Sequence, residues 1–284
     1  MVEKQGSRDI MSNSPVTHQQ RIDKHFDASA QHWKDLYQDR SLEGVIHQHR
    51  RSVALRWIEG LALSTPVRVL EVGCGAGLVA MDLARHGYDV DCIDTSKEMV
   101  ALAMAEAQDA AVAGGLTIDV GDVHALSFDS SAFDLVIALG VVPFLHSPEK
   151  ALVEMGRVCR RGSWVLLSSD NKFRLNRLLD PRFVPFPGRE WFKDVLSAIG
   201  VKGEPEVPVN FFSHRVITKM LARAGFHVER CVTIGFGPFR FLGKDFVADP
   251  RAITLNTWLQ ERADRGVPAL RSVGAQHLIL ARKV

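Results

Sequence analysis

The sequence predicts an α/β fold, a doubly wound and mostly parallel sheet with helices on both faces. Two observations predict it. From residue 67 onward, short apolar runs typical of buried strands alternate with amphipathic segments typical of helices. The first apolar run leads directly into a glycine-rich turn and a helix, as at the start of a βαβ unit. Strands joined in this way form a parallel sheet that is covered on both faces.

Two helices are expected before the first strand. Apolar side chains recur every three or four residues from Ile22 to Tyr37, and a second apolar face runs over 45–63. Residues 21–66 are therefore expected to form an N-terminal helical cap. Residues 1–20 lack the apolar core of a secretory signal, and we expect a disordered leader there.

Residues 67–284 are expected to form the core. The expected strands are 67–72, 89–94, 116–120, 133–139, 163–169, 226–234 and 276–283. The expected helices are 78–86, a helix opened by the capping box Thr95–Glu98 and running to about 113, 147–160, 213–224 and 253–265. The alternation stops at about 171–212 and 235–272, and we expect lid insertions there.

The composition is that of an ordinary globular protein. The chain of 284 residues is 46% apolar and 24% charged, and its net charge of +2 does not indicate a nucleic-acid partner. No apolar run approaches the roughly 20 residues of a membrane-spanning helix. None of the four cysteines forms a C-x-x-C pair, so we expect a reduced, cytoplasmic protein. No cluster of metal ligands is expected, and the sequence leaves the oligomeric state open.

The central motif is the turn after the first strand, where residues 71–77 read EVGCGAG. Glycines let the backbone approach a nucleotide closely, although such a turn is also typical of a tight connection without a ligand. Dinucleotide folds prefer G-x-G-x-x-G, in which the helix N-terminus receives a pyrophosphate. Here position 78 is Leu and Glu71 precedes the turn. The loop therefore suits a ligand without phosphates that carries an ammonium or sulfonium group.

Acidic residues follow the next two strands. Asp94 ends the second strand, where a carboxylate can accept hydrogen bonds from ribose hydroxyls. Asp122 follows the third strand, where it can accept from an adenine amino group. Ligands of open α/β sheets bind at the carboxyl ends of the strands, so we expect Glu71, both aspartates and the turn after Leu139 on one edge. Each carboxylate alone is more often a solvated loop residue.

Residues 69–77, VLEVGCGAG, resemble the first motif of class I S-adenosylmethionine-dependent methyltransferases. Asp94, the sequence GDV at 121–123 and the sequence FDLV at 133–136 resemble the next three motifs of that family in order. The resemblance implies a seven-stranded, Rossmann-like sheet with an antiparallel last strand and the cofactor S-adenosyl-L-methionine. It also implies that Asp94 binds ribose, that 122–123 bind adenine, and that the glycine loop lies under the methionine part. The residues that we expect to bind the cofactor are Glu71, Gly73, Cys74, Gly75, Gly77, Asp94, Thr95, Met99, Asp122, Val123 and Leu139.

Two features indicate a small-molecule substrate. The turn at 139–144, LGVVPF, lacks the Asn-Pro-Pro-Tyr type sequence of methyltransferases that act on amino groups of nucleic acid and protein. The segment 26–37 resembles the N-terminal lid helix of members that act on quinones and magnesium porphyrins. Tyr37 is placed to close over the cofactor, or equally to pack half-buried against the domain.

The insertions carry the residues expected to select the substrate. Eleven of the fifteen phenylalanines follow residue 170, so the insertions form a small core, line a ligand pocket, or do both. Arg174 and Arg177 lie among them. Such arginines either clamp a carboxylate or phosphate or are simply solvated on lid helices. We expect a small apolar metabolite, with or without one anionic end.

Catalytic residues are harder to predict, because methyl transfer needs little beyond placement of the reactants. A base helps when the nucleophile is a hydroxyl or an acidic carbon. The candidates are His146, His214 and Tyr37, although a structural role is the more common one for such residues. We expect methyl transfer to oxygen or carbon. The alternatives are an NAD(P)-dependent oxidoreductase and a non-catalytic cofactor-binding module.

Overall fold

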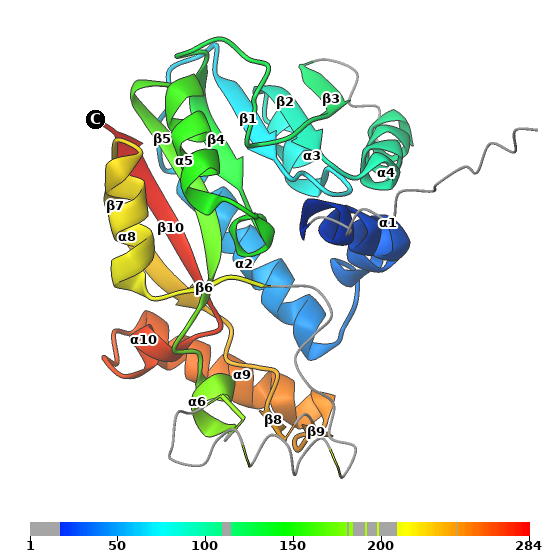
Figure 1. The fold of residues 1–284 in the computed structure, drawn as a ribbon, viewed down its shortest axis with the longest axis vertical. Coiled ribbons are helices and arrows are strands. Elements are labelled where there is room, and N and C mark those ends of the chain that lie inside the picture. Colours follow the sequence, from blue (N-terminus) through cyan, green and yellow to red (C-terminus); the bar gives the residue numbers. More distant parts are fainter. Residues whose placement is uncertain are drawn as a thin grey trace, which may run out of the picture.

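The computed structural model describes residues 18–109, 115–180, 182, 183, 191, 198, 209–242 and 244–284. The fold is an α/β sandwich around one main sheet with the strand order β3-β2-β1-β4-β5-β10-β7 (Figure 1). The main strands are β1 Arg68–Val72, β2 Asp89–Asp94, β3 Leu116–Val120, β4 Phe133–Ala138, β5 Cys159–Asn171, β7 Phe226–Ile234 and β10 Gln276–Lys283. All pairs between β3 and β5 are parallel, and β10 is antiparallel to both β5 and β7. The doubly wound, mostly parallel sheet with an antiparallel last strand is therefore confirmed.

The order of the strands determines where a ligand-binding crevice can form. The chain winds from β1 to β2 and β3 in one direction, and then from β4 to β5 in the other. Helices after β1 and β4 therefore leave in opposite directions, and a crevice opens at the carboxyl ends of these two strands. One short strand, β6 at Phe211–Phe212, extends the sheet further by pairing with the last residues of β5.

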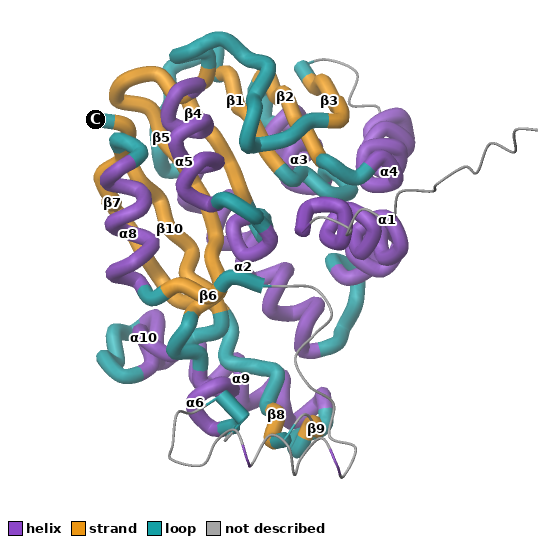
Figure 2. The backbone as a smooth tube through the Cα atoms, viewed as in Figure 1, coloured by secondary structure: helices purple, strands orange, loops and turns teal. Residues whose placement is uncertain are grey.

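Helices cover both faces of the sheet (Figure 2). The helices are α1 His18–Leu36, α2 Leu42–Glu59, α3 Leu78–Arg85, α4 Lys97–Asp109, α5 Pro148–Val158, α6 Leu175–Leu179, α8 His214–Arg223, α9 Asp249–Asp264 and α10 Leu270–Val273, with a 3-10 turn η1 at Val142–Phe144. Side chains of α2, α3, α4 and α9 form one buried cluster with alternate residues of the strands, and those of α5 and α8 form a second cluster with the others. This alternation follows from the two-residue period of a strand. Within the described residues, no helix has the length and apolar character needed to cross a membrane.

The expected elements are present, with shifts at their ends. Helix α4 is capped by Ser96 rather than by the predicted Thr95, because the Ser96 hydroxyl accepts the Met99 N–H at 3.1 Å. Strand β5 begins at Cys159, before the predicted residue 163, and α5 ends correspondingly earlier. Helix α9 begins at Asp249 instead of residue 253, with proline in its first turn. The leader expected at 1–20 lies outside the described residues up to position 17, and α1 already begins at His18.

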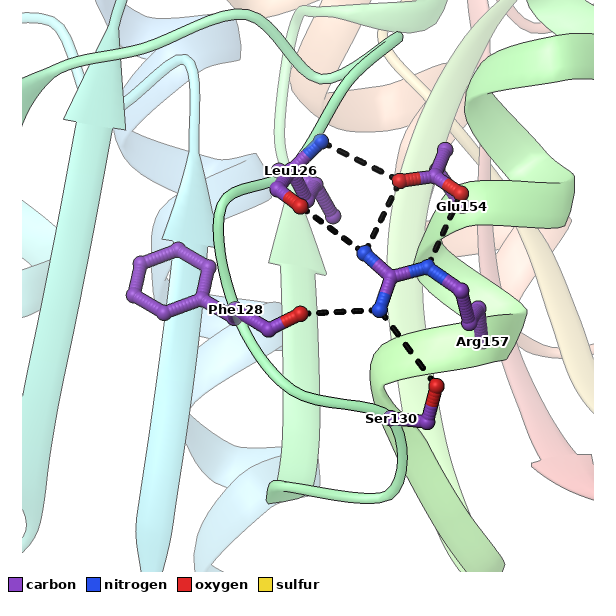
Figure 3. A network of polar contacts seen from close by, with 5 residues as sticks. All are labelled: Leu126, Phe128, Ser130, Glu154 and Arg157. Atoms are coloured by element: carbon purple, nitrogen blue, oxygen red, sulfur yellow. Dashed lines mark hydrogen bonds and ion pairs between the residues drawn. The ribbon is translucent and has the colours of Figure 1, made fainter.

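Arg157 on α5 holds the loop that follows β3 (Figure 3). Its guanidinium donates to the backbone carbonyls of Leu126 and Phe128, each at 2.8 Å, and to the carboxylate of Glu154. Glu154 in turn accepts the Leu126 N–H at 3.1 Å. A planar group with five donors is suited to tie several carbonyls together. The network therefore fixes the segment that begins at the predicted adenine-binding residue Asp122.

The N-terminal cap lies over the carboxyl edge of the sheet. Helix α1 is joined to α4 by a 2.6 Å hydrogen bond from Ser96 to Asp27 and by the ion pair of Lys34 with Glu106. The Phe26 ring packs edge-on against Phe144 of η1, with ring centroids 5.0 Å apart. These contacts hold the cap over the crevice at the carboxyl ends of β1 and β4.

Candidate active site

A cavity of about 1060 Å³ lies at the carboxyl ends of the strands, enclosed by the cap and the segment after β7. It is of the size that holds a nucleoside cofactor together with a small second ligand. Nearly all residues predicted to bind the cofactor line it: Glu71, Gly73, Cys74, Gly75, Asp94, Thr95, Met99, Asp122, Val123 and Leu139. Gly77 is the exception among these predicted residues. It caps α3, and a side chain there would press on Ala103 of α4.

The glycine loop has the backbone conformation that only glycine adopts easily. Gly73, Gly75 and Gly77 have φ angles of +62°, +55° and +74°. A Cβ atom at Gly73 would also collide with the Val141 side chain. The loop therefore packs closely against Val141 in the turn after β4, and residues 73–76 of the loop line the cavity.

Asp94 is fixed at the end of β2 by backbone donors. One carboxylate oxygen accepts the Gly75 N–H and the other accepts the Ser96 N–H, both at 2.9 Å. Burial raises the pKa of Asp94, although these hydrogen bonds act in the opposite direction. Each carboxylate oxygen has a second lone pair, so the residue can still accept hydrogen bonds from a pair of ligand hydroxyls.

Glu71 is a buried carboxyl group without a complete set of partners. Its side chain is 4% exposed, and its Oε2 atom has no hydrogen-bond partner in the described part of the chain. Burial raises the pKa of Glu71 to about 8. At this pKa the group is largely protonated at neutral pH, whereas the sequence suggested a carboxylate. A cationic ligand beside it would favour the ionised form, so the site fits an ammonium- or sulfonium-bearing cofactor.

Asp122, which the sequence predicts to contact adenine, follows β3 and lines the cavity. It accepts hydrogen bonds from the backbone N–H and the Nδ1 atom of His124, at 2.9 and 2.7 Å. Burial acts to raise the pKa of Asp122, but these bonds outweigh it and the pKa is lowered. The His124 ring stacks on His146, with centroids 3.8 Å apart. Asp122 is thus held as an ionised acceptor at the rim of the cavity.

The three predicted catalytic residues are placed very differently. Tyr37 lines the cavity, and its hydroxyl accepts a hydrogen bond from Arg50 at 3.2 Å. His146 is exposed, contacts Gln19 of α1 at 3.0 Å and does not line the cavity. His214 is exposed at the start of α8, near His277, and is also outside the cavity lining. Of the three, only Tyr37 reaches the space where a substrate would bind.

A polar chain that was not predicted from the sequence crosses the other half of the cavity. It runs from Arg50 on α2 through Gln276 on β10 to Asp170 on β5 and Arg174. One signal was available: Arg50 lies three and four residues before the buried Val53 and Ala54, hence on the apolar face of its helix. The pairing of Gln276 with Asp170 depends on the antiparallel insertion of β10 beside β5, which local sequence does not encode.

Comparisons with known proteins agree with this geometry. The family model described as a methyltransferase domain matches residues 70–167. A phosphatidylethanolamine N-methyltransferase from Cereibacter sphaeroides is 37% identical over 100 residues, 35% of this chain and 49% of that protein. A ubiquinone biosynthesis O-methyltransferase from Paracidovorax citrulli is 32% identical over 52% of this chain and 60% of its own length. The chain thus spans about half the length of the curated relatives that it matches.

Solved structures extend the likeness to nearly the whole chain. The magnesium protoporphyrin IX methyltransferase from Synechocystis, with bound S-adenosylhomocysteine, superposes with a TM-score of 0.62 at 17% identity, covering 94% of this chain and 100% of that one. The cyclase SpnF superposes with a TM-score of 0.61 at 16% identity, covering 95% and 97%. At these identities the likeness shows the fold. Residues 70–167 therefore match a methyltransferase domain, and the chain as a whole has the Rossmann-like fold of these solved methyltransferase structures.

Proposed function

We propose that the protein transfers a methyl group from S-adenosyl-L-methionine to an oxygen or carbon atom of a small, mostly apolar metabolite. The observation that carries the proposal is the common cavity of Glu71, Asp94 and Asp122, which lie at the ends of three neighbouring strands beside a glycine loop. When bound, the cofactor would supply an already activated methyl group. The match to the methyltransferase domain favours this reaction over nicotinamide-dependent oxidation.

The residues present fit the cofactor. Asp94 would accept the ribose hydroxyls, and Asp122 with Val123 would hold the adenine. The loop at 73–75 and Glu71 would hold the methionine part and its positive charge. The Oε2 atom of Glu71, which has no hydrogen-bond partner among the described residues, is otherwise unexplained.

The protein's own contribution would be placement of the acceptor and exclusion of water. Phe26, Trp33 and Tyr37 of the cap line the cavity together with Pro143 and Phe144 of η1. Aromatic walls of this kind bury an apolar ligand and leave it few orientations. Holding the accepting atom in line with a methyl group provides most of the rate of such a transfer.

The cap at 21–66 and the insertion at 235–272 would close this cavity. Both contribute lining residues, for example Trp33 from the cap and Phe239 from the insertion. The insertion at 171–212 lies largely outside the described residues, although Arg174 and Arg177 from its first part also line the cavity. We further propose a reducing, cytoplasmic location, in keeping with four unpaired cysteines, and no nucleic-acid partner.

The experiment is methyl transfer from radiolabelled S-adenosylmethionine to a deproteinised extract of small metabolites. We expect label in a fraction that partitions into organic solvent, and inhibition of this labelling by S-adenosylhomocysteine. The cyclase SpnF shows why a direct assay is needed, since one fold can host different reactions. Cofactor binding without any transfer would instead support a binding module or another reaction.

A further inference from the structure

Arg50 is a buried cation in the wall of the cavity. Its side chain is 3% exposed, and its two terminal nitrogens contact the Tyr37 hydroxyl at 3.2 Å, His47 Nδ1 at 3.2 Å and Gln276 Oε1 at 3.0 Å. All three partners are uncharged. Burial, aided by the charge of Arg50, holds the pKa of His47 well below its usual range. The Nε atom of Arg50 has no partner in the described part of the chain.

A buried guanidinium normally lies against a carboxylate. Among the described residues no carboxylate lies within ion-pair distance of Arg50, although Arg51 beside it pairs with Asp82. Removing a charge from water without an opposite charge is strongly unfavourable. The described surroundings of Arg50 therefore favour the binding of an anion beside its guanidinium.

One carboxylate, that of Asp170, is linked to Arg50 through Gln276, and it also contacts Arg174. Its Oδ1 accepts from Gln276 at 3.1 Å, and its Oδ2 lies 3.4 Å from Arg174 Nη1. The Arg174 guanidinium also lies 4.6 Å above the Phe211 ring, and its Nε is buried without a partner. Two arginines thus face one carboxylate. The cluster formed by Arg50, Gln276, Asp170 and Arg174 carries a net positive charge.

This cluster lies apart from the residues assigned to the cofactor. Arg50 approaches Gly140 after β4, and Asp170 and Gln276 lie at the ends of β5 and β10. Glu71 and Asp94 lie at the ends of β1 and β2. Strand β10 is three places from β1 in the sheet, roughly 14 Å at the usual spacing of neighbouring strands. Both groups line the same cavity, so a second ligand beside the cofactor would meet the arginines.

We propose that the cluster is an anion subsite for this second ligand, and that the acceptor substrate is an amphiphile with one carboxylate at the end of an apolar body. The carboxylate would lie against Arg50 and Arg174, and the apolar body against the aromatic residues of the cap. That this ligand accepts the methyl group rests on the proposed function, whereas binding of a carboxylate amphiphile does not. The subsite therefore has a test of its own.

The test measures binding of decanoate, with decanamide as an uncharged ligand of the same length. Titrations use the full chain saturated with S-adenosylhomocysteine and follow tryptophan fluorescence, to which Trp33 in the cavity wall contributes. We expect decanoate to bind at least tenfold more tightly than decanamide. Arg50→Gln should reduce decanoate affinity at least tenfold and leave affinity for S-adenosylhomocysteine within about twofold.

Arg51→Gln is the matched control, because Arg51 is the next residue on the same helix but contacts Asp82 and the Leu78 carbonyl instead of the cavity. It should bind decanoate like the wild type. Asp170→Asn removes the competing carboxylate and should strengthen decanoate binding. If Arg50→Gln does not fold, Arg174→Gln replaces it, since that side chain is 24% exposed at the edge of the cavity.

Equal affinities for decanoate and decanamide would overturn the proposal, as would equal decanoate affinities of the Arg50 and Arg51 variants. Loss of S-adenosylhomocysteine binding in Arg50→Gln with unchanged decanoate binding would assign Arg50 to the cofactor and also overturn it. Failure of the wild type to bind S-adenosylhomocysteine would contradict the proposed function instead. In that case charge-selective decanoate binding by the unliganded protein would still support the subsite.

Discussion

Asp94 accepts the backbone N–H of Gly75 at 2.9 Å, so the end of β2 and the glycine loop after β1 are joined by one hydrogen bond. Asp94, predicted to bind ribose, and the glycine loop, predicted to hold the methionine part of the cofactor, are thereby parts of one unit. The same carboxylate accepts the Ser96 N–H at the start of α4. Any change at Asp94 should therefore affect both cofactor affinity and the geometry of the loop.

Asp94→Ala should weaken binding of S-adenosylhomocysteine roughly 10- to 100-fold. The variant loses the acceptor for the ligand and leaves the Gly75 N–H unpaired, at about 1–3 kcal/mol. Isothermal titration calorimetry measures the change. Asp89→Ala, at the exposed start of the same strand, is the control and should bind like the wild type. Equal losses in both variants would show a general effect on β2 instead of a ligand contact.

Gly73→Ala should abolish detectable cofactor binding and lower the melting temperature. Alanine at a φ of +62° is strained, and its Cβ would collide with Val141. Gly87→Ala separates these effects, because Gly87 has a φ of +83° but no atom within 4 Å of an added Cβ. That control should cost only about 1–2 kcal/mol of stability and keep full affinity. A Gly73 variant that binds normally would contradict the close loop packing.

Glu71 should make the unliganded protein less stable as pH rises. Its pKa is raised to about 8 in the folded state, from 4.5, so the folded state binds more protons than the unfolded state between these values. Stability then falls as pH rises through this range, by an amount on the order of a few kcal/mol. Glu71→Gln does not titrate and should match the wild type near pH 4.5 but be more stable above pH 8. Parallel pH profiles of melting temperature for the two proteins would refute this assignment.

Arg157→Ala should loosen the loop after β3. The variant loses charged hydrogen bonds to the Leu126 and Phe128 carbonyls, and we expect a loss of about 2–3 kcal/mol in the free energy of unfolding. Urea unfolding measures it. Affinity for S-adenosylhomocysteine should fall severalfold, because Asp122 begins this loop. Arg161→Ala, which replaces an exposed arginine near the start of β5, should change neither quantity.

Much of the fold was predictable from the sequence, because the central strands β1, β4 and β5 each contain a short, mostly apolar run. The ends of elements were less predictable. Both Thr95 and Ser96 can cap a helix, and the hydrogen bond from Asp94 to the Ser96 N–H selects the second. The early start of β5 at Cys159 depends on pairing with Phe133, a contact between distant segments.

The two halves of the site also differ in how far local sequence predicts them. The cofactor half follows motifs that lie at successive strand ends, so local sequence was enough to expect Glu71, Asp94 and Asp122 together. The polar cluster of Arg50, Asp170 and Gln276 comes from three segments far apart in the chain. It is brought together only by the antiparallel position of β10 beside β5 and by the docking of α2. No local pattern encodes that arrangement.

Calorimetric titration of the full chain with S-adenosylhomocysteine, with NAD titrated under the same conditions, tests whether the cavity holds the sulfonium cofactor. We expect saturable binding of S-adenosylhomocysteine at one site per chain, loss of that binding in Asp94→Ala, and no heat of binding with NAD. Binding of NAD in preference to S-adenosylhomocysteine, or no heat with S-adenosylhomocysteine and S-adenosylmethionine alike, would contradict this expectation.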